Sequence, residues 1–356
     1  MEIVRKRTYA RAGLLGNPSD GYHGKTISVI VRNFWAEVVL YEWDSVDIVL
    51  AQNDRASFRS VYDLAKDVQL HGYYGGIRLV KATIKRFVEY CQAQNISLHE
   101  RNFSVRYETN IPRQVGMAGS SAIIVSTLRC LMAYYDVQMP LEIQPTFVLS
   151  VELELGITGG LQDRVIQCYE GVVYMDFAKA RERTIHGLRC YHYEPLDPAL
   201  LPSLYVAYHN ALSEPTELFH NDIRGRYDRG DQVVIGAMDA CAVLAHEGRA
   251  AILSSDGAKL SQLINENFGV RRGIYNLPPW QVEMVETAQR CGASAKFAGS
   301  GGAIIGVYEG EEMFRELTQA LGAIGSRTFK PVVESRGVEE WRSGGVEEWR
   351  SGGVEE

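Results

Sequence analysis

This sequence lacks long apolar runs and has no excess of positive charge. No segment of its 356 residues approaches the roughly 20 consecutive apolar residues of a membrane-spanning helix. The formal net charge is −7, whereas nucleic acids and anionic membranes favour a basic surface on the proteins that bind them. We therefore expect neither as a partner, although a local basic site for phosphate is compatible with this charge.

Cysteine is sparse and shows no pattern. The six cysteines are scattered and include no Cys-x-x-Cys pair, which favours reduced, mostly buried thiols over a disulfide framework. Residues 1–7 carry no apolar core of the length that secretion signals need. The hydrophobic fraction of 46% and the charged fraction of 23% are those of a soluble globular protein. We expect a cytoplasmic protein with one large domain or two closely packed ones.

The carboxyl-terminal segment is repetitive. The octapeptide Gly-Val-Glu-Glu-Trp-Arg-Ser-Gly occupies residues 337–344, recurs at 345–352 and begins again at 353. Two and a fraction copies of a polar, glycine-containing unit cannot bury a core. We predict that residues 335–356 form a disordered tail without a catalytic role.

The remaining sequence mixes strand and helix patterns. Segments 26–31 and 35–40 are predicted to be adjacent strands of a hairpin, and residues 103–109 alternate as a strand does. Apolar residues at helical spacing predict a helix over 121–135, and Pro145 opens another that Gly156 ends. Further helices are expected at 232–249 and 256–267, and further strands at 172–177 and 303–308. This mixture without a regular βαβ repeat favours an α+β fold.

The strongest local motif follows the predicted strand 103–109 and leads directly into a helix. Its glycines let the backbone approach a ligand, and the helix start offers free N–H groups to a phosphate. The motif lacks the Gly-Lys-Ser/Thr ending of a Walker loop, and a serine cap beside a turn is the structural alternative. Its sequence is Pro112-Arg113-Gln114-Val115-Gly116-Met117-Ala118-Gly119-Ser120-Ser121-Ala122.

Two further segments contain glycine clusters. Gly299, Ser300 and Gly301 precede a predicted buried strand, where a tight hairpin would explain them equally well. Glu152 lies on a predicted helix that leads through a glycine-rich loop to Asp163. One carboxylate could hold magnesium while the other orients or deprotonates an attacking hydroxyl. Taken alone, a surface glutamate and a helix-capping aspartate are the more frequent explanation.

A fourth segment, residues 10–22, contains the Gly, Asn, Pro and Asp of a turn. All four segments, taken in their order along the chain, resemble the GHMP kinase superfamily. Pro-x-x-x-Gly-Met-x-x-Ser-Ser-Ala is similar to its phosphate loop, residues 299–302 to its carboxyl-terminal glycine motif, and residues 11–20 to its first motif. The resemblance implies a two-lobed α+β fold. Residues 1–196 would form a ribosomal S5-like lobe and residues 197–334 a ferredoxin-like lobe, with the active site between them.

Several stretches resemble one branch of this superfamily, the glucuronokinases of plants. The similar stretches are residues 15–20, 72–76, 101–104, 110–114, 160–164 and 296–302. This resemblance implies an enzyme that uses ATP and Mg²⁺ to phosphorylate D-glucuronate at the anomeric hydroxyl. The product, glucuronate 1-phosphate, would feed UDP-glucuronate synthesis.

The resemblance also implies a role for individual residues. Asp163 is similar to the catalytic aspartate that orients or deprotonates the sugar hydroxyl, and Arg11 to a cation near the transferred phosphoryl group. Ser121 and Glu152 are similar to the magnesium ligands. Residues 116–120 would surround the β- and γ-phosphates, and Asp20 would hydrogen-bond sugar hydroxyls.

Asn17 favours an acidic sugar. Galactokinases carry Glu at the corresponding position, where it meets the hydroxyl on carbon six of the sugar. Glucuronate has a carboxylate at that carbon, which a Glu would repel and a neutral amide can bind. An arginine is the expected partner of the carboxylate, with Arg164 the first candidate before Arg78 and Arg271. Tyr73 and Tyr74 could line the sugar pocket or anchor a loop.

Other functions remain open at this level. A kinase for galacturonate, arabinose, fucose or a heptose would differ in only one or two contacts. A non-catalytic sugar sensor need not keep Arg11, Ser121, Glu152 and Asp163 together. A scaffold protein that assembles through the tryptophan-containing tail has only that tail in its favour.

Overall fold

The computed structural model describes residues 3–49, 75–209 and 217–335. Tyr73, Tyr74 and the repeats from residue 336 onward lie outside these ranges, so the predictions made for them stay predictions. Within the described residues, helices and mostly antiparallel sheets are mixed, which confirms the α+β class. None of the described helices is long and apolar enough to cross a membrane.

The first sheet is organised around one long strand, β2 (Lys25–Trp43). Strand β1 (Ile3–Leu15) pairs with β2 along nearly its whole length, so the other edge of β2 is left for β4 and β5 in succession. The path through the sheet is β3-β4-β2-β5-β8. The remaining strands are β3 (Asp47–Val49), β4 (Asn102–Thr109), β5 (Val172–Asp176) and β8 (His192–Leu196).

The hairpin predicted for residues 26–40 is wrong, because both segments belong to β2. The register moves from Ala10↔Val31 to Tyr9↔Trp35, which leaves Arg32, Asn33 and Phe34 as a bulge in β2. Arg32 and Asn33 have the polarity that is typical of a turn, but their hydrogen bonds are made with the last described residues of the chain. The backbone N–H of Arg32 donates to Val332 O at 3.0 Å, and the Asn33 side chain bonds the backbone of residues 330 and 332.

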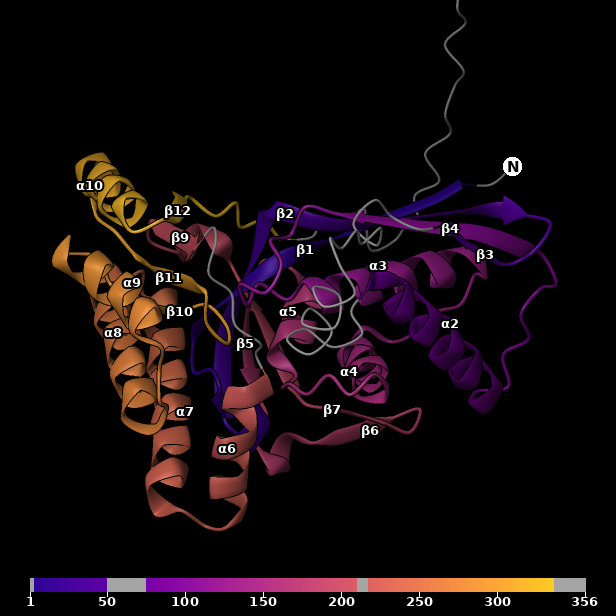
Figure 1. The fold of residues 1–356 in the computed structure, drawn as a ribbon. Helices are drawn as coiled ribbons and strands as arrows, with labels where there is room; N and C mark the ends of the chain where they lie inside the picture. The colour runs from indigo at the N-terminus through magenta and orange to yellow at the C-terminus, as the bar shows by residue number, and fades with distance from the viewer. Residues whose placement is uncertain (1–2, 50–74, 210–216, 336–356) are drawn as a thin grey trace, which may run out of the picture.

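The helices of this part of the chain lie on one side of this sheet (Figure 1). The predicted helix at 121–135 is confirmed as α3, and its residues Ile124, Val125 and Leu128 are fully buried in the core. The helix predicted to begin at Pro145 is also confirmed, and Gly156 follows it with φ 75°. The four helices are α2 (Gly76–Ala93), α3 (Gly119–Tyr134), α4 (Gln144–Glu154) and α5 (Gln162–Tyr169).

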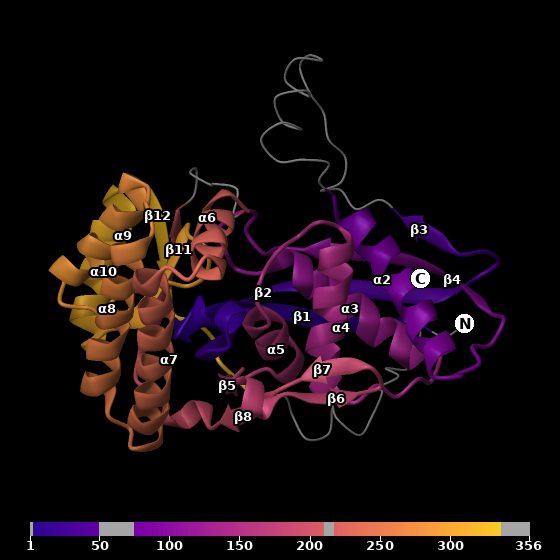
Figure 2. The same cartoon turned by 90° about the horizontal axis from the view of Figure 1, so that it is seen from below.

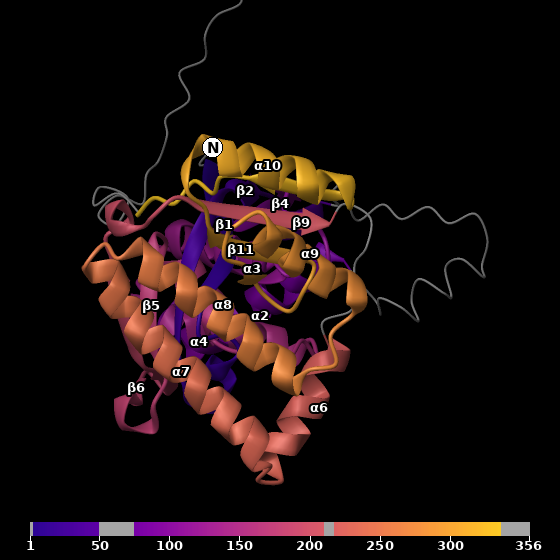
Figure 3. The same cartoon turned by 90° about the vertical axis from the view of Figure 1, so that its left-hand side faces the viewer.

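The second sheet follows in the chain and is covered by helices on one side (Figures 1 and 3). Its order is β10-β11-β9-β12, from β9 (Leu204–His209), β10 (Lys296–Phe297), β11 (Ala303–Val307) and β12 (Ser326–Phe329). The associated helices are α6 (Glu217–Asp228), α7 (Gln232–Leu253), α8 (Gly257–Ile274), α9 (Pro279–Arg290) and α10 (Gly310–Ala323). Helices α7 and α8 were predicted correctly but are longer than expected.

Short elements complete the described chain. They are the 3-10 turns η1 (Ser19–Tyr22), η3 (Leu141–Ile143), η4 (Lys179–Arg181) and η5 (Pro198–Leu200), and the hairpin of β6 (Arg183–Ile185) and β7 (Leu188–Cys190). A lobe boundary between residues 196 and 197 would fall between β8 and β9, and it stays a proposal.

The two sheets meet at the end of β1. Figure 2 shows α7 and α8 at one end of β1 and β2. The N–H of Gly13 donates to Ala298 O at 2.7 Å, and the N–H of Gly16 donates to Asn267 Oδ1 of α8 at 2.8 Å. Both contacts join the end of the first strand to the second sheet and its helices. Segments far apart in the sequence therefore converge on residues 11–17.

Gly306 in β11 provides a test of the second sheet. A Cβ at this position would lie 1.7 Å from Ser294 O, and it would also meet the buried Tyr205 ring. We expect Gly306→Ala to lower the free energy of unfolding by about 2 kcal/mol, because the backbone must shift to admit the methyl group. Gly236→Ala on α7, where nothing lies within 4 Å, should instead raise it by up to about 1 kcal/mol. Urea unfolding of both variants checks this, and equal shifts would contradict the packing described.

Candidate active site

The predicted phosphate loop connects β4 to α3. Gln114, Gly116 and Ala118 all have left-handed backbone conformations, with φ of 56°, 71° and 62°. Ala118 caps α3 without a side-chain hydrogen bond. The N–H groups in the first turn of α3 therefore have no capping side chain, and they are suited to an anion.

The loop residues divide into those that face the core and those that face the second sheet. Val115 and Met117 are buried in the core, so they contribute to a ligand site through their backbone. A Cβ on Gly116 would lie 2.7 Å from Gly301 O, and one on Gly299 would lie 2.2 Å from Gly116 O. The phosphate loop (residues 112–122) therefore touches the glycine segment (residues 298–302). The two sequence motifs alone could not show this contact.

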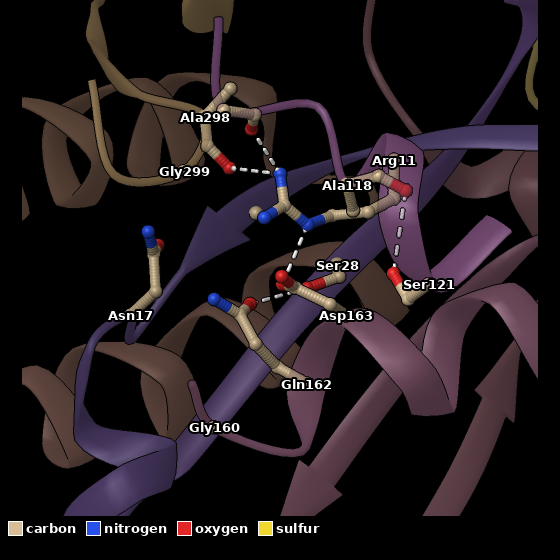
Figure 4. A network of polar contacts seen from close by, with 12 residues as sticks. Arg11, Asn17, Ser28, Ala118, Ser121, Gly160, Gln162, Asp163, Ala298 and Gly299 are labelled. Carbon is tan, nitrogen blue, oxygen red and sulfur yellow. Dashed lines mark hydrogen bonds and ion pairs between the residues drawn. The ribbon is translucent and has the colours of Figure 1, made fainter. Parts of the chain in front are cut away.

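Arg11 joins three segments of the chain. It lies on β1 and is 4% exposed. Its Nε donates to Asp163 Oδ1 at 2.6 Å, and its Nη1 donates to the carbonyl oxygens of Gly116 and Ala298 (Figure 4). One guanidinium group thus contacts the phosphate loop, the glycine segment and the predicted catalytic carboxylate.

Asp163 lies in the first turn of α5, with a side chain that is 18% exposed. Besides Arg11, its other oxygen lies 3.5 Å from Nη1 of Arg164. Two guanidinium groups therefore flank this carboxylate, and they stabilise its negative charge. The structure brings together Arg11 and Asp163, which the sequence placed 152 residues apart.

Arg164 has other partners than the sugar carboxylate proposed for it. It is 4% exposed, and both its Nε and its Nη2 contact Glu152 Oε2, while Nη1 donates to Gly160 O at 2.6 Å. Glu152 is completely buried. A buried carboxylate is costly unless a cation and hydrogen bonds compensate it, and Arg164 supplies both.

The hydroxyl beside Glu152 belongs to Ser120. Ser120 Oγ donates to Glu152 Oε1 at 2.7 Å, whereas Ser121 Oγ donates to Ala118 O at 3.3 Å. No cluster of three or more metal-ligating side chains occurs among the described residues. Magnesium in kinases is held through one or two carboxylates together with phosphate oxygens and water. Glu152 Oε1 and the serine hydroxyls fit such a site at the start of α3.

Asp20 lies beside the loop that leads to α5. The N–H of Gln162 donates to Asp20 Oδ2 at 3.1 Å, and a Cβ on Gly160 would lie 1.7 Å from that oxygen. Burial, with the nearby charge of Asp163, raises the pKa of Asp20 to about 7 against the opposing effect of the Gln162 N–H and Arg164. Near neutral pH this carboxyl group can therefore either donate or accept a hydrogen bond.

Asn17 contacts a lysine to which the sequence analysis assigned no role. Lys296 of β10 is 1% exposed, and its Nζ donates to Asn17 Oδ1 at 2.5 Å. Burial, together with Arg271 and Arg11, lowers the pKa of Lys296 well below its ordinary value, although Cys241 opposes this. A signal was available, because Lys296 interrupts the otherwise uncharged stretch 291–303.

The other arginine candidates have different positions. Arg271 of α8 donates from Nη1 to Gly299 O at 2.6 Å and from Nη2 to Ser300 O at 2.7 Å. It therefore holds the backbone of the glycine segment. Arg78 lies near the start of α2.

Gln162, which precedes Asp163, is held by a serine of β2. The hydroxyl of Ser28 donates to Gln162 Oε1 at 2.8 Å.

Two family models match this chain. Residues 78–171 match the GHMP kinases N terminal domain, and residues 249–325 match the GHMP kinases C terminal model. The first contains the phosphate loop, Glu152 and Asp163. The second contains Lys296 and the glycine segment.

Individual proteins are also similar to this chain. Glucuronokinase 1 of Arabidopsis thaliana is 44% identical over 311 residues, covering 85% of this chain and 84% of the relative. A Lin0012 protein from Listeria innocua has a TM-score of 0.76 at 13% identity, covering 93% of this chain and 98% of its own. Streptococcus pneumoniae phosphomevalonate kinase in complex with phosphomevalonate and AMPPNP has a TM-score of 0.71 at 14% identity, covering 92% and 99%.

The two structural likenesses show the fold, and the plant relative shows the family. The chain therefore belongs to the GHMP kinases, as a relative of the plant glucuronokinase.

Proposed function

We propose that this protein phosphorylates D-glucuronate at its anomeric hydroxyl, with ATP as donor and Mg²⁺ as cofactor. The product would be glucuronate 1-phosphate, a precursor for UDP-glucuronate synthesis. One observation carries the proposal: the Arg11 guanidinium contacts Asp163, the phosphate loop and the glycine segment at once. The identity with Glucuronokinase 1 of Arabidopsis thaliana supports the choice of sugar.

Catalysis would rest on position and charge. Asp163 would accept the proton of the anomeric hydroxyl or orient it, and the bond from Arg11 to its Oδ1 fixes the orientation of the carboxylate. Arg11 is also close enough to the phosphate loop to stabilise charge on the phosphoryl group that is transferred. The hydroxyl and the phosphoryl group would meet between α5 and the start of α3.

The nucleotide side of the site consists of backbone groups and oxygen ligands. Backbone N–H groups of residues 116–120 would bind the β- and γ-phosphates. Glu152 with Ser120 or Ser121 would hold the magnesium ion, which neutralises phosphate charge when bound. Arg164 holds Glu152 in position, so we propose that it serves the metal ligand and not the sugar carboxylate.

The sugar side of the site contains Asn17 and Asp20. Asn17 is neutral and 2% exposed, so it can donate a hydrogen bond to a carboxylate without adding negative charge. Asp20, fixed by the Gln162 N–H, would bond sugar hydroxyls.

The first prediction concerns substrate and catalytic residue together. The kcat/KM for ADP release should be highest with D-glucuronate in a panel with galacturonate, arabinose, fucose, glucose and a heptose. Asp163→Asn should lower kcat by about 1,000-fold or more, since the orienting charge and proton acceptor are lost. A higher kcat/KM on a different sugar would replace the proposed substrate but keep the kinase. Sugar binding without any turnover would instead favour a sensor.

The second prediction concerns the pair of Arg164 and Glu152. Arg164→Met should lower the free energy of unfolding by about 3–5 kcal/mol, because a buried carboxylate loses its cation. Adding Glu152→Gln should restore most of that loss. Urea unfolding of the single and double variants measures the coupling. If Arg164→Met raised the KM for glucuronate without loss of stability, Arg164 would be the sugar ligand after all.

The third prediction follows from the raised pKa of Asp20. The folded state resists ionisation of Asp20, so its contribution to stability falls as pH rises from about 4 to about 7. Asp20→Asn removes this effect. The free energy of unfolding of the variant should therefore rise relative to that of the wild type between about pH 4 and pH 7, and the difference should stay constant at higher pH. Urea unfolding at pH 4.5, 6 and 8 tests the trend, with Asp239→Asn on the exposed face of α7 as control. An Asp20→Asn difference that is independent of pH would contradict the shifted pKa.

A further inference from the structure

Lys296 has three oxygen partners and, among the described residues, no carboxylate within ion-pair distance. Its Nζ donates to Asn17 Oδ1 at 2.5 Å, to Gly13 O at 2.8 Å and to Phe297 O at 2.8 Å. A lysine ammonium has three N–H donors and no acceptor. The three partners therefore use its whole hydrogen-bonding capacity, and two of them are backbone carbonyls that can only accept.

This arrangement determines which end of the Asn17 amide faces the lysine. An ammonium group cannot accept a hydrogen bond, so the amide must turn its oxygen toward Lys296. Because the amide group is planar, its nitrogen then points to the other side. The structure has this orientation, with Oδ1 of Asn17 on Lys296.

The backbone around Asn17 is held on both sides. Gly13 N–H donates to Ala298 O, and Gly16 N–H donates to Asn267 Oδ1. A Cβ on Gly13 would lie only 3.0 Å from Asn17 Oδ1, so the amide is closely packed as well. Ala298 O also receives the bond from Arg11, which links the position of Asn17 to that of the catalytic arginine. In Figure 4, Asn17 lies to the left of Arg11, Asp163 and Gln162 and makes none of the contacts drawn.

We propose that Lys296 is a positioning residue for sugar specificity, which holds Asn17 Oδ1 so that Nδ2 presents an N–H donor to the carboxylate of an acidic sugar. This inference rests on the proposed function and names the residue that determines its preference for a uronic acid. Lys296 touches no substrate in this role and acts through Asn17.

The protonation state of Lys296 gives the proposal a second consequence. A neutral amine would donate to Gly13 O and Phe297 O and accept from Asn17 Nδ2, which would turn the amide oxygen toward the sugar. Burial and the positive charges of Arg271 on α8 and Arg11 on β1 favour this neutral form, and Cys241 on α7 opposes it. A bound carboxylate favours the ammonium form, so glucuronate binding should be coupled to uptake of a proton.

The experiment compares kcat/KM for D-glucuronate with that for D-glucose, which carries a hydroxymethyl group at carbon six. Asn17→Asp replaces the N–H donor by an oxygen, and it should lower the glucuronate-to-glucose ratio by about 100-fold. Lys296→Met should lower the ratio by about 10-fold through the KM for glucuronate, with little change in the KM for ATP. Lys259→Met, on the exposed side of α8, is the matched control and should leave the ratio unchanged.

Folding and titration are controlled separately. Lys296→Gln, which keeps N–H donors, gives a second variant should Lys296→Met fail to fold. A pH series compares the wild type with Lys296→Gln, so that the titration of Asp20 is common to both proteins. The ratio of the KM for glucuronate to the KM for glucose should rise with pH in the wild type and stay constant in the variant.

The outcomes separate the two proposals. If the wild type does not phosphorylate glucuronate, the proposed function fails. If it does, but the ratio is unchanged in the Lys296 variants, the role of Lys296 is overturned, and a flat pH series overturns the coupling to proton uptake. Equal losses with glucuronate, glucose and ATP would also overturn it, because they indicate a purely structural lysine.

Discussion

The site depends on one buried guanidinium group. Arg11 is the point where β1, the phosphate loop, the glycine segment and α5 are connected, through Asp163, Gly116 and Ala298. Burying an arginine is costly unless its donors are satisfied, and here the acceptors come from α5, the loop before α3 and the segment that follows β10. The same bonds that satisfy Arg11 therefore set the distance between the carboxylate and the phosphate loop. Fold and chemistry share this requirement, since a shift of either sheet would leave the cation unpaired.

Two further buried basic side chains connect distant segments by donating to backbone oxygens. Arg271 bonds the carbonyls of Gly299 and Ser300, and Lys296 bonds those of Gly13 and Phe297. Both are nearly inaccessible to solvent. The region around the glycine segment is consequently rich in buried basic side chains although the whole chain is acidic. A substrate pair that carries a triphosphate and a carboxylate suits such a region.

The sequence predicted the elements that carry a periodic or glycine-rich pattern, including α3, α7, β4 and the loop before α3. It also named Arg11, Asp163, Glu152 and Asn17. It could not predict which side chains meet, because Arg164 and Glu152 are ordinary surface residues in a linear pattern and become a buried pair only when α4 packs against α5. The bulge at Arg32 was invisible for the same reason, since its partners lie near residue 332.

That bulge has a consequence for how the chain matures. Arg32 bonds Glu334 and Glu170, and Ser335 bridges to Glu170, so the last described residues pack on the bulge of a sheet whose own strands all lie within residues 3–196. The strands can therefore pair before residues 330–335 have been synthesised. Until then the backbone N–H of Arg32 and the side-chain amide of Asn33 lack their partners. The bulge is the part of the first sheet whose hydrogen bonds form last along the chain.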